Sequence, residues 1–379
     1  MKSPDAVVVG AGAIGLACAW RLAQRDLSVC VVDPDPGCGA SRVAAGMLAP
    51  VTEVHFGEEP LLALNLESAR RYPSFVAELE GEAGRSVGYI ACGTLAVAAD
   101  ADDHAALGQL YDFQRRLGLD VERLTSRECR RLEPSLSPTV RGGLRVGQDH
   151  QVDPRRLVEA LIAAGSAAGV QVVRRRVVEI AIGPDDRVEA VHLDDGTEVA
   201  AGCVVLASGA WSGQVAGLPP GAVPPVRPVK GQLLRLHSHS GPALLRGNVR
   251  GLVAGSGVYM VPRADGEVVV GATMEEQGYD TMVTAGAVHD LLRDAYALVP
   301  GVTELELAEA SAGLRPCTPD NAPVIGLAPV EGLVLAVGHF RNGILLTPVT
   351  ADIVGDIITG GSVPELARAF GADRFLLAS

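Results

Sequence analysis

The feature that most constrains the fold is a glycine-rich turn between two short apolar runs near the N-terminus. Residues 10–15 read Gly-Ala-Gly-Ala-Ile-Gly, and they separate the apolar runs 6–9 and 29–32. This order predicts a strand, a turn, a helix that reaches about residue 25, and a second strand. Gly10 permits the tight turn, Gly12 lets the backbone approach a pyrophosphate, and Gly15 lets the helix pack on the strand.

An acidic residue completes this pattern. Asp33 ends the second apolar run, 18 residues after Gly15 (33 − 15). A carboxylate at this position suits the two ribose hydroxyls of an adenosine, and the helix N-terminus offers N–H groups to a phosphate. The N-terminal segment therefore predicts a dinucleotide site. NAD and FAD both stay open at this point, whereas the carboxylate of Asp33 disfavours NADP.

Length and composition limit the remaining possibilities. A chain of 379 residues favours two domains, and 48% hydrophobic with 20% charged residues is typical of a globular protein. The net charge of −13 argues against nucleic acid as a partner. The uncharged stretch 6–20 is too short to span a bilayer, and no signal peptide is evident. We expect a cytoplasmic protein that does not enter the membrane.

Cysteine and histidine positions give no sign of a disulfide framework or a metal site. The seven cysteines are scattered and never spaced C-x-x-C. We therefore expect no metal ion and a reducing environment.

Three further motifs accompany the glycine turn. Residues 41–47 are small residues with a hydroxyl, residues 204–212 form an apolar run that ends in a glycine turn, and residues 338–346 form a polar loop that leads into an apolar helix. The last motif presents a helix N-terminus and a cation to an anion. Taken singly, the first would also fit an ordinary helix start and the second an ordinary core strand.

Periodicity predicts further helices over 58–81, 105–117, 153–169 and 288–298, and one that ends near residue 359. Strands are expected around 172–180 and at 188–193, 204–207, 232–236, 258–261, 268–270 and 333–337. A proline-rich linker is expected at 219–228. Nucleotide-type strands recur late in the chain. We therefore expect a discontinuous FAD-binding domain of residues 1–84, 146–215 and 306–379, interrupted by a substrate-binding domain of residues 85–145 and 216–305.

In this order and spacing, the four motifs resemble the D-amino-acid oxidase superfamily of FAD-dependent oxidoreductases. Segments 41–47, 258–263, 270–274, 312–316 and 338–346 closely resemble the glycine oxidases of the thiamine pathway, and the resemblance covers nearly the whole chain. It implies an α/β plus α+β architecture, with a Rossmann-like FAD-binding domain and an antiparallel-sheet substrate domain. It also implies noncovalent FAD, a homotetramer, and oxidation of glycine to its imine with dioxygen reduced to hydrogen peroxide.

The resemblance also assigns site residues. The substrate carboxylate is expected on Arg315 and Tyr259, with Met274 on the pocket wall and Arg341 near substrate or flavin. Residues 312–316 are expected to form a turn in which Gly313 and Pro316 fix the backbone of Arg315. An arginine suits a carboxylate because its planar fork donates two parallel hydrogen bonds. No side chain is assigned as a catalytic acid or base. The expected cofactor-binding residues are Gly10, Gly12, Ala13, Ile14, Gly15, Asp33, Pro34, Ala40, Ser41, Ala45, Gly46, Met47, Val177, Gly209, His339, Phe340, Arg341, Asn342, Gly343, Ile344 and Leu345.

Several positions depart from the family pattern. Gly257 stands where some members carry His, Ser311 stands where others have an aromatic residue, and Cys317 replaces a glycine. Cys317 lies four positions after the place of the flavin-linking cysteine of sarcosine oxidases, here Gly313, so we expect a small buried thiol. Ala49 and Pro50 are expected to narrow the entrance of the pocket.

Three other functions stay open. The first is a sarcosine or D-amino-acid oxidase with a wider pocket. The second is a dehydrogenase that passes electrons to a quinone or carrier, which an exposed apolar patch would favour, although none is obvious in the sequence. The third is an FAD-binding assembly protein without turnover.

Overall fold

The glycine turn and the strands around it form the centre of a six-stranded sheet. The computed structural model describes residues 3–239 and 241–378. The strand order is β18 (Val324–Leu327), β19 (Leu333–Val337), β12 (Val204–Leu206), β1 (Ala6–Val9), β2 (Val29–Val32) and β8 (Gln171–Val173). All neighbouring strands are parallel except β18, which is antiparallel to β19.

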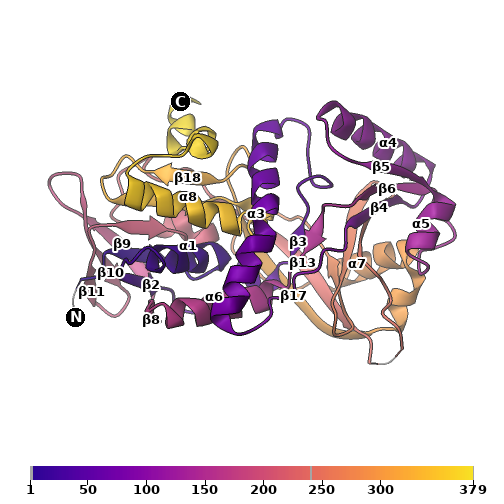
Figure 1. The fold of residues 1–379 in the computed structure, drawn as a ribbon, viewed down its shortest axis with the longest axis horizontal. Helices are drawn as coiled ribbons and strands as arrows, with labels where there is room; N and C mark the ends of the chain where they lie inside the picture. Colours follow the sequence, from indigo (N-terminus) through magenta and orange to yellow (C-terminus); the bar gives the residue numbers. More distant parts are fainter. Residues whose placement is uncertain (1–2, 240, 379) are drawn as a thin grey trace.

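Both faces of this sheet are covered, as its valine-rich strands require. Alternate residues of β1 pack against α1 (Ala13–Ala23), α3 (Glu59–Ala83), α6 (Pro154–Ala167) and α8 (Thr347–Gly360). The other residues pack against a three-stranded sheet of β9 (Val177–Ile182), β10 (Val188–Leu193) and β11 (Glu198–Ala200). Figure 1 shows these elements in its left half, with α3 standing between the two halves of the molecule.

The second half of the molecule is built on an eight-stranded sheet (Figure 1). Only the pair β14–β4 is parallel, and the other neighbours are antiparallel. One face packs on α7 (Ala285–Leu298), while α4 (Ala101–Arg116) and α5 (Ser126–Leu132) contact the strands at the far end. In order, the strands are β17 (Glu306–Cys317), β13 (Arg227–His237), β16 (Glu267–Gly271), β15 (Ser256–Pro262), β14 (Asn248–Val253), β4 (Thr94–Ala98), β6 (Gly142–Val146) and β5 (Glu122–Thr125).

This arrangement confirms the predicted fold class, a Rossmann-like sheet beside a largely antiparallel sheet. Most predicted helices and strands are present with small shifts at their ends. The strand expected around 172–180 is instead β8 and β9, which belong to different sheets, and β13 begins at Arg227, inside the expected linker. One shift has a local cause, because the side chain of Asp100 accepts hydrogen bonds from the N–H groups of Asp102 and Asp103 and starts α4 earlier than expected. The division into domains remains a proposal. Strand β17, which we expected in the FAD-binding domain, pairs with β13 of the eight-stranded sheet.

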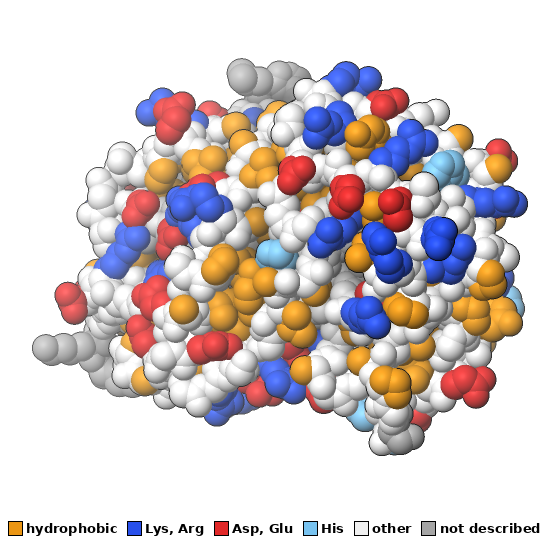
Figure 2. Space-filling model, turned by 45° about the vertical axis from the view of Figure 1, so that its right-hand side comes forward, with side chains coloured by type: hydrophobic (Ala, Val, Ile, Leu, Met, Phe, Trp, Pro, Cys, Tyr) orange, Lys and Arg blue, Asp and Glu red, His pale blue; other side chains and the backbone are white. Residues whose placement is uncertain are grey.

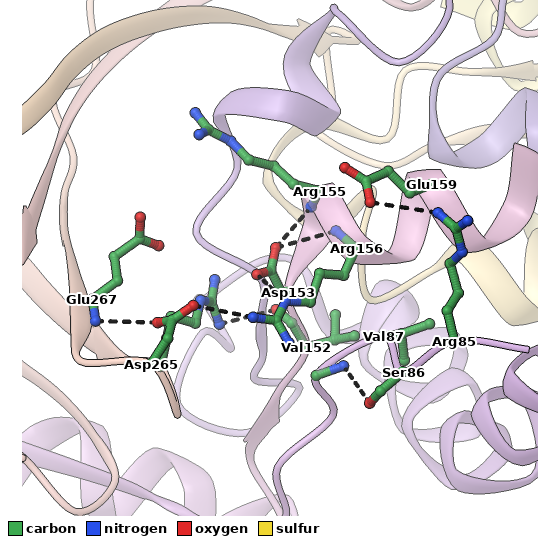
Figure 3. A network of polar contacts seen from close by, with 12 residues as sticks. Arg85, Ser86, Val87, Val152, Asp153, Arg155, Arg156, Glu159, Asp265 and Glu267 are labelled. Atoms are coloured by element: carbon green, nitrogen blue, oxygen red, sulfur yellow. Dashed lines mark hydrogen bonds and ion pairs between the residues drawn. The ribbon is translucent and has the colours of Figure 1, made fainter.

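Charged side chains join the two halves around the N-terminus of α6 (Figure 3). The side chain of Asp153 accepts hydrogen bonds from the first N–H groups of this helix. Arg156 forms an ion pair with Asp265, which follows β15, at 3.1 Å. Arg155 pairs with Glu309 of β17 at 2.6 Å. The helix that supports the first sheet is therefore tied to strand β17 and to the turn between β15 and β16 of the second.

Three further observations concern the surface, the helices and possible metal ligands. On the face in Figure 2, Lys and Arg side chains gather toward the right, and hydrophobic side chains gather near the centre. Among the described residues, no helix is both long and apolar enough to cross a membrane. Over the same residues, no group of three His, Cys, Asp or Glu side chains could hold a metal ion.

Candidate active site

One large cavity of about 1030 Å³ is lined by residues of both sheets. Its walls come from the glycine turn, from residues 37–47, from the start of the segment after β12, from β14, β15 and β17, and from residues 336–344. Ordinary small-molecule pockets reach about 1,000 Å³. The cavity can therefore hold a ligand the size of a dinucleotide.

The glycine turn forms one end of this cavity. Gly10 has φ +106°, and a Cβ there would lie 2.5 Å from the carbonyl oxygen of Ala207. The N–H of Ala11 donates to Asp33 Oδ2 at 2.8 Å, and the N–H of Ala13 donates to Ser41 Oγ at 3.0 Å. The carboxylate of Asp33 therefore holds the turn in shape while it lines the cavity.

The segment after α2 (Ala40–Val43) forms a second wall. Gly46 has φ +79°, and its carbonyl accepts a hydrogen bond from Val152 N at 2.9 Å. A Cβ at Gly46 would collide with the carbonyl oxygen of Val152. Only glycine allows this backbone approach, which places Ala45 and Met47 along the cavity. Met47 begins β3 (Met47–Leu48), which pairs with β7 (His150–Gln151).

Arg315 and Tyr259 lie together at the other end. The guanidinium of Arg315 donates to the carbonyl of Thr273 at 3.1 Å, and a Cβ on Gly231 would collide with it. Among the described residues, no Asp or Glu forms an ion pair with Arg315. Burial raises the pKa of the Tyr259 hydroxyl, and the nearby Arg315 acts in the opposite direction. The cavity thus ends in an unneutralised cation beside a phenol, which suits a carboxylate.

Arg315 corrects one expectation. We expected it in a turn fixed by Gly313 and Pro316, but it lies in the long strand β17 and pairs with Val229 of β13. The small residues of this segment serve a different purpose. Gly231 and Gly313 are cross-strand partners that line the cavity, and their missing side chains leave space for the guanidinium of Arg315 and for the side chain of Val43.

Loop 49–58 brings charged side chains that the sequence did not reveal. Glu53 forms an ion pair with Arg250 of β14 at 3.0 Å, and Glu58 forms one with Arg341. His55 lines the same part of the cavity. Each ion pair joins residues about 200 or more positions apart in the chain. No local pattern could have identified them.

His339 stands apart as a buried histidine on the cavity wall. It is 3% exposed, and its Nε2 lies 3.0 Å from the hydroxyl of Thr350. Burial lowers the pKa of His339 to about 3, so the ring is neutral at ordinary pH. It therefore adds shape rather than charge to the cavity.

Most of the predicted site residues line the cavity. The four predicted substrate residues do so, although Met274 is 71% exposed at its rim. Three predicted cofactor residues do not: Gly15 packs its helix against the glycine turn, and Asn342 and Leu345 are buried beside the wall. The contacts themselves remain predictions. The predicted cofactor-binding residues that line the cavity are Gly10, Gly12, Ala13, Ile14, Asp33, Pro34, Ala40, Ser41, Ala45, Gly46, Met47, Val177, Gly209, His339, Phe340, Arg341, Gly343 and Ile344.

Two further expectations can be compared with the structure. Ala49 and Pro50 are buried and do not line the cavity, so Glu53 and His55 of the same loop narrow it instead. Cys317 is fully buried, as expected, and its thiol donates to Asn321 Oδ1 at 3.1 Å. Burial raises the pKa of this thiol, which disfavours the reactive thiolate.

A comparison with protein families decides where the chain belongs. The sequence profile of the family FAD dependent oxidoreductase matches residues 5–357. The chain is a member of the FAD dependent oxidoreductase family. The cofactor of this oxidoreductase is FAD, and the glycine turn, the close approach at Gly46 and the cavity volume fit it.

Individual relatives are similar over the whole chain. The oxidoreductase is 36% identical to a "Bifunctional protein ThiO/ThiG" of Synechocystis over 98% of its length and 54% of the relative. It is 34% identical to a "Glycine oxidase" of Geobacillus kaustophilus, over 93% of this chain and 92% of that one. A crystal structure of glycine oxidase from the latter organism superposes with a TM-score of 0.90, at 32% identity and 98% coverage of both chains. The chain spans about half the length of the bifunctional relatives it matches.

Proposed function

We propose that this oxidoreductase oxidises glycine to its imine, uses dioxygen as electron acceptor, and supplies the imine for thiamine thiazole synthesis. The names of the relatives support this activity. The single observation that carries the proposal is the unneutralised Arg315 beside Tyr259. These residues line the same cavity as the glycine turn, so substrate and cofactor would meet within it.

The described side chains would act by binding and positioning. Arg315 would hold the substrate carboxylate through two parallel hydrogen bonds, and the Tyr259 hydroxyl would donate a third. The ion pairs of Glu53 and Glu58 would keep loop 49–58 over the substrate and exclude water. When bound, FAD supplies the two-electron oxidation of the carbon–nitrogen bond. We assign no side-chain base, because the amine reacts in its neutral form.

A small substrate follows from the walls around Arg315. The ion pair between Glu53 and Arg250 occupies the space beside Tyr259, because Arg250 and Tyr259 are directly opposite on paired strands. A bulky apolar side chain would have to displace these charges from one another, and an unpaired, partly buried charge is costly. We therefore expect glycine first, sarcosine second, and bulky D-amino acids as poor substrates.

Anaerobic mixing tests this proposal directly. The FAD-loaded protein is mixed with glycine, sarcosine, D-alanine and D-proline, and the flavin absorbance near 450 nm is followed. Glycine should bleach the flavin fastest. Faster bleaching by D-alanine or D-proline would instead identify a D-amino-acid oxidase, and no bleaching by any amine would favour an FAD-binding assembly protein.

A second candidate, a dehydrogenase with a carrier as acceptor, is favoured by exposed apolar side chains that the sequence did not reveal. Met274 and Met282 are 71% and 66% exposed, and the partly exposed rings of Tyr279 and Trp211 lie 6.2 Å apart. Met274 and Trp211 also line the cavity. Reoxidation of the reduced protein separates the candidates, because an oxidase reacts with dioxygen faster than with a soluble quinone.

Three finer properties rest on the family resemblance alone. We propose noncovalent FAD, a homotetramer and a cytoplasmic location. Acid precipitation that leaves the yellow colour in the pellet would contradict noncovalent binding. Light scattering on the purified protein tests the tetramer.

A further inference from the structure

Arg263, directly after β15, is a buried cation without an acidic partner. It is 6% exposed. Its Nη1 donates to Gln151 Oε1 at 2.6 Å and to the carbonyl of Val152 at 3.1 Å, and its Nη2 donates to the carbonyl of Ala45 at 2.5 Å. Among the described residues, no Asp or Glu forms an ion pair with it. All three acceptors are neutral oxygens.

A buried cation of this kind is costly, because its hydrogen-bond acceptors are neutral and no described carboxylate pairs with it directly. Another strand of the same sheet shows the ordinary solution. Arg235 of β13 is 2% exposed and forms an ion pair with Glu267 at 2.5 Å. Charge neutralisation therefore does not explain why an arginine is buried at position 263. The explanation lies in the segments to which its three acceptors belong.

One acceptor residue of Arg263, Ala45, lines the cavity, and the other two contact the segment that follows it. Gln151 pairs with Met47 in the β3–β7 ribbon, and Val152 holds the carbonyl of Gly46. Ala45 lines the cavity and also accepts directly from the guanidinium. One planar side chain thus binds β7 and the residues just before β3, and it does not itself line the cavity.

Strand β15 connects this anchor to the substrate end. Side chains alternate along a strand, so Tyr259, Val261 and Arg263 share one face, and Val261 and Tyr259 pack with Ala45 and Met47. Four residues of extended chain span about 13 Å. Strand β15 therefore places Tyr259 beside Arg315. Four residues further along the same chain, Arg263 holds segment 45–47 of the cavity wall.

We propose that Arg263 is a positioning residue for FAD, which holds segment 45–47 against the eight-stranded sheet and so sets the spacing between the cofactor wall and the substrate end. The proposal depends on the family's cofactor and not on which amine is oxidised. A failure of glycine as substrate would leave it intact.

The test compares two buried arginines. Arg263→Lys keeps the charge but loses the fork that reaches all three acceptors. Arg235→Lys is the matched control, since Arg235 is similarly buried and pairs with Glu267, and it forms no hydrogen bond with the described segment 45–47. Gln151→Leu removes the one side-chain oxygen among the three acceptors and leaves the arginine unchanged. Each protein is freed of FAD, its thermal midpoint is recorded, and FAD is titrated by fluorescence quenching.

We expect Arg263→Lys to raise the dissociation constant of FAD about tenfold or more, since charge-assisted hydrogen bonds are lost. Gln151→Leu should raise it at least about threefold by the same reasoning. The absorption maxima of the bound flavin should also shift in both. The dissociation constant of FAD for Arg235→Lys should stay within about twofold of the parent value. The thermal midpoint of Arg235→Lys should nevertheless fall as much as that of Arg263→Lys.

Two results would overturn the proposal. The first is FAD binding by Arg263→Lys and Gln151→Leu that matches the parent protein. The second is equal weakening of FAD binding by Arg235→Lys, which would make Arg263 a general core residue. If Arg263→Lys does not fold, the comparison of Gln151→Leu with Arg235→Lys decides.

Discussion

At the scale of single residues, Arg315 has the clearest expected role. Removing one partner of a buried charge pair costs about 3–5 kcal/mol, because the other charge stays unpaired. Arg315→Ala should therefore lower kcat/KM for glycine by about two to four powers of ten. Arg315→Lys should lose less activity than Arg315→Ala but remain below the parent protein, because lysine keeps the charge and lacks the planar fork. Steady-state kinetics on FAD-loaded protein measure this. Arg341→Ala is the comparison, since Arg341 is already paired with Glu58. A larger loss from Arg341→Ala would mean that Arg341 binds the carboxylate.

His339 gives a pH dependence at the same scale. Burial lowers its pKa to about 3, whereas an unfolded histidine titrates near about 6.5. The unfolded chain therefore binds the proton more readily, so this stabilising contribution is complete above pH 6.5 and falls as the pH drops toward 3. Between pH 6.5 and 5 the loss is about 2 kcal/mol.

Urea unfolding of the FAD-free protein at pH 7 and pH 5 checks this value. The variant His339→Gln should lose about 2 kcal/mol less than the parent on acidification. His289→Gln, which replaces an exposed histidine, should behave like the parent. Equal losses in all three proteins would show that His339 does not titrate as described.

At the scale of elements, loop 49–58 depends on one buried carboxylate. Asp149 accepts hydrogen bonds from the N–H groups of Val51 and Thr52, at 3.1 and 2.7 Å, and from the Thr52 hydroxyl at 2.6 Å. Asp149→Asn turns an acceptor into a donor that faces these groups. This substitution should lower the free energy of unfolding by about 1–3 kcal/mol. It should also raise the KM for glycine, because Glu53, which pairs with Arg250 at the cavity, directly follows Thr52.

Thermal unfolding and glycine kinetics measure the two effects of Asp149→Asn. Asp195→Asn, in the exposed turn between β10 and β11, controls for the same chemical change. A lower thermal midpoint with an unchanged KM would show that the loop does not contribute to substrate binding.

At the scale of the whole molecule, FAD should stabilise the fold, because its cavity is lined by both sheets. At 100 times its dissociation constant, a ligand adds about 2.7 kcal/mol. Each kcal/mol shifts the melting temperature of a large domain by roughly 2–4 °C. The FAD-loaded protein should therefore melt at least about 5 °C above the FAD-free protein by differential scanning fluorimetry. Equal melting temperatures would mean that the cavity is not the FAD site.

Local chemistry alone determined much of this protein. The glycines, the apolar runs and Asp33 all lie within one strand–helix–strand unit, so short-range spacing was enough to predict the dinucleotide site. Helix starts such as the one at Asp153 are likewise local, because the capping side chain and the N–H groups that it accepts from are near neighbours. The motif around Arg315 identified the residue but not its strand.

Only the tertiary structure decided the features that complete the site. Glu53 meets Arg250, Glu58 meets Arg341, and Arg263 meets Ala45 across 197, 283 and 218 positions of the chain. A single sequence carries no signal for such pairs, because each residue taken alone would also fit an exposed surface. Their partners are set by how β14, β15 and loop 49–58 pack, so folding and not local pattern determines how the cavity is closed.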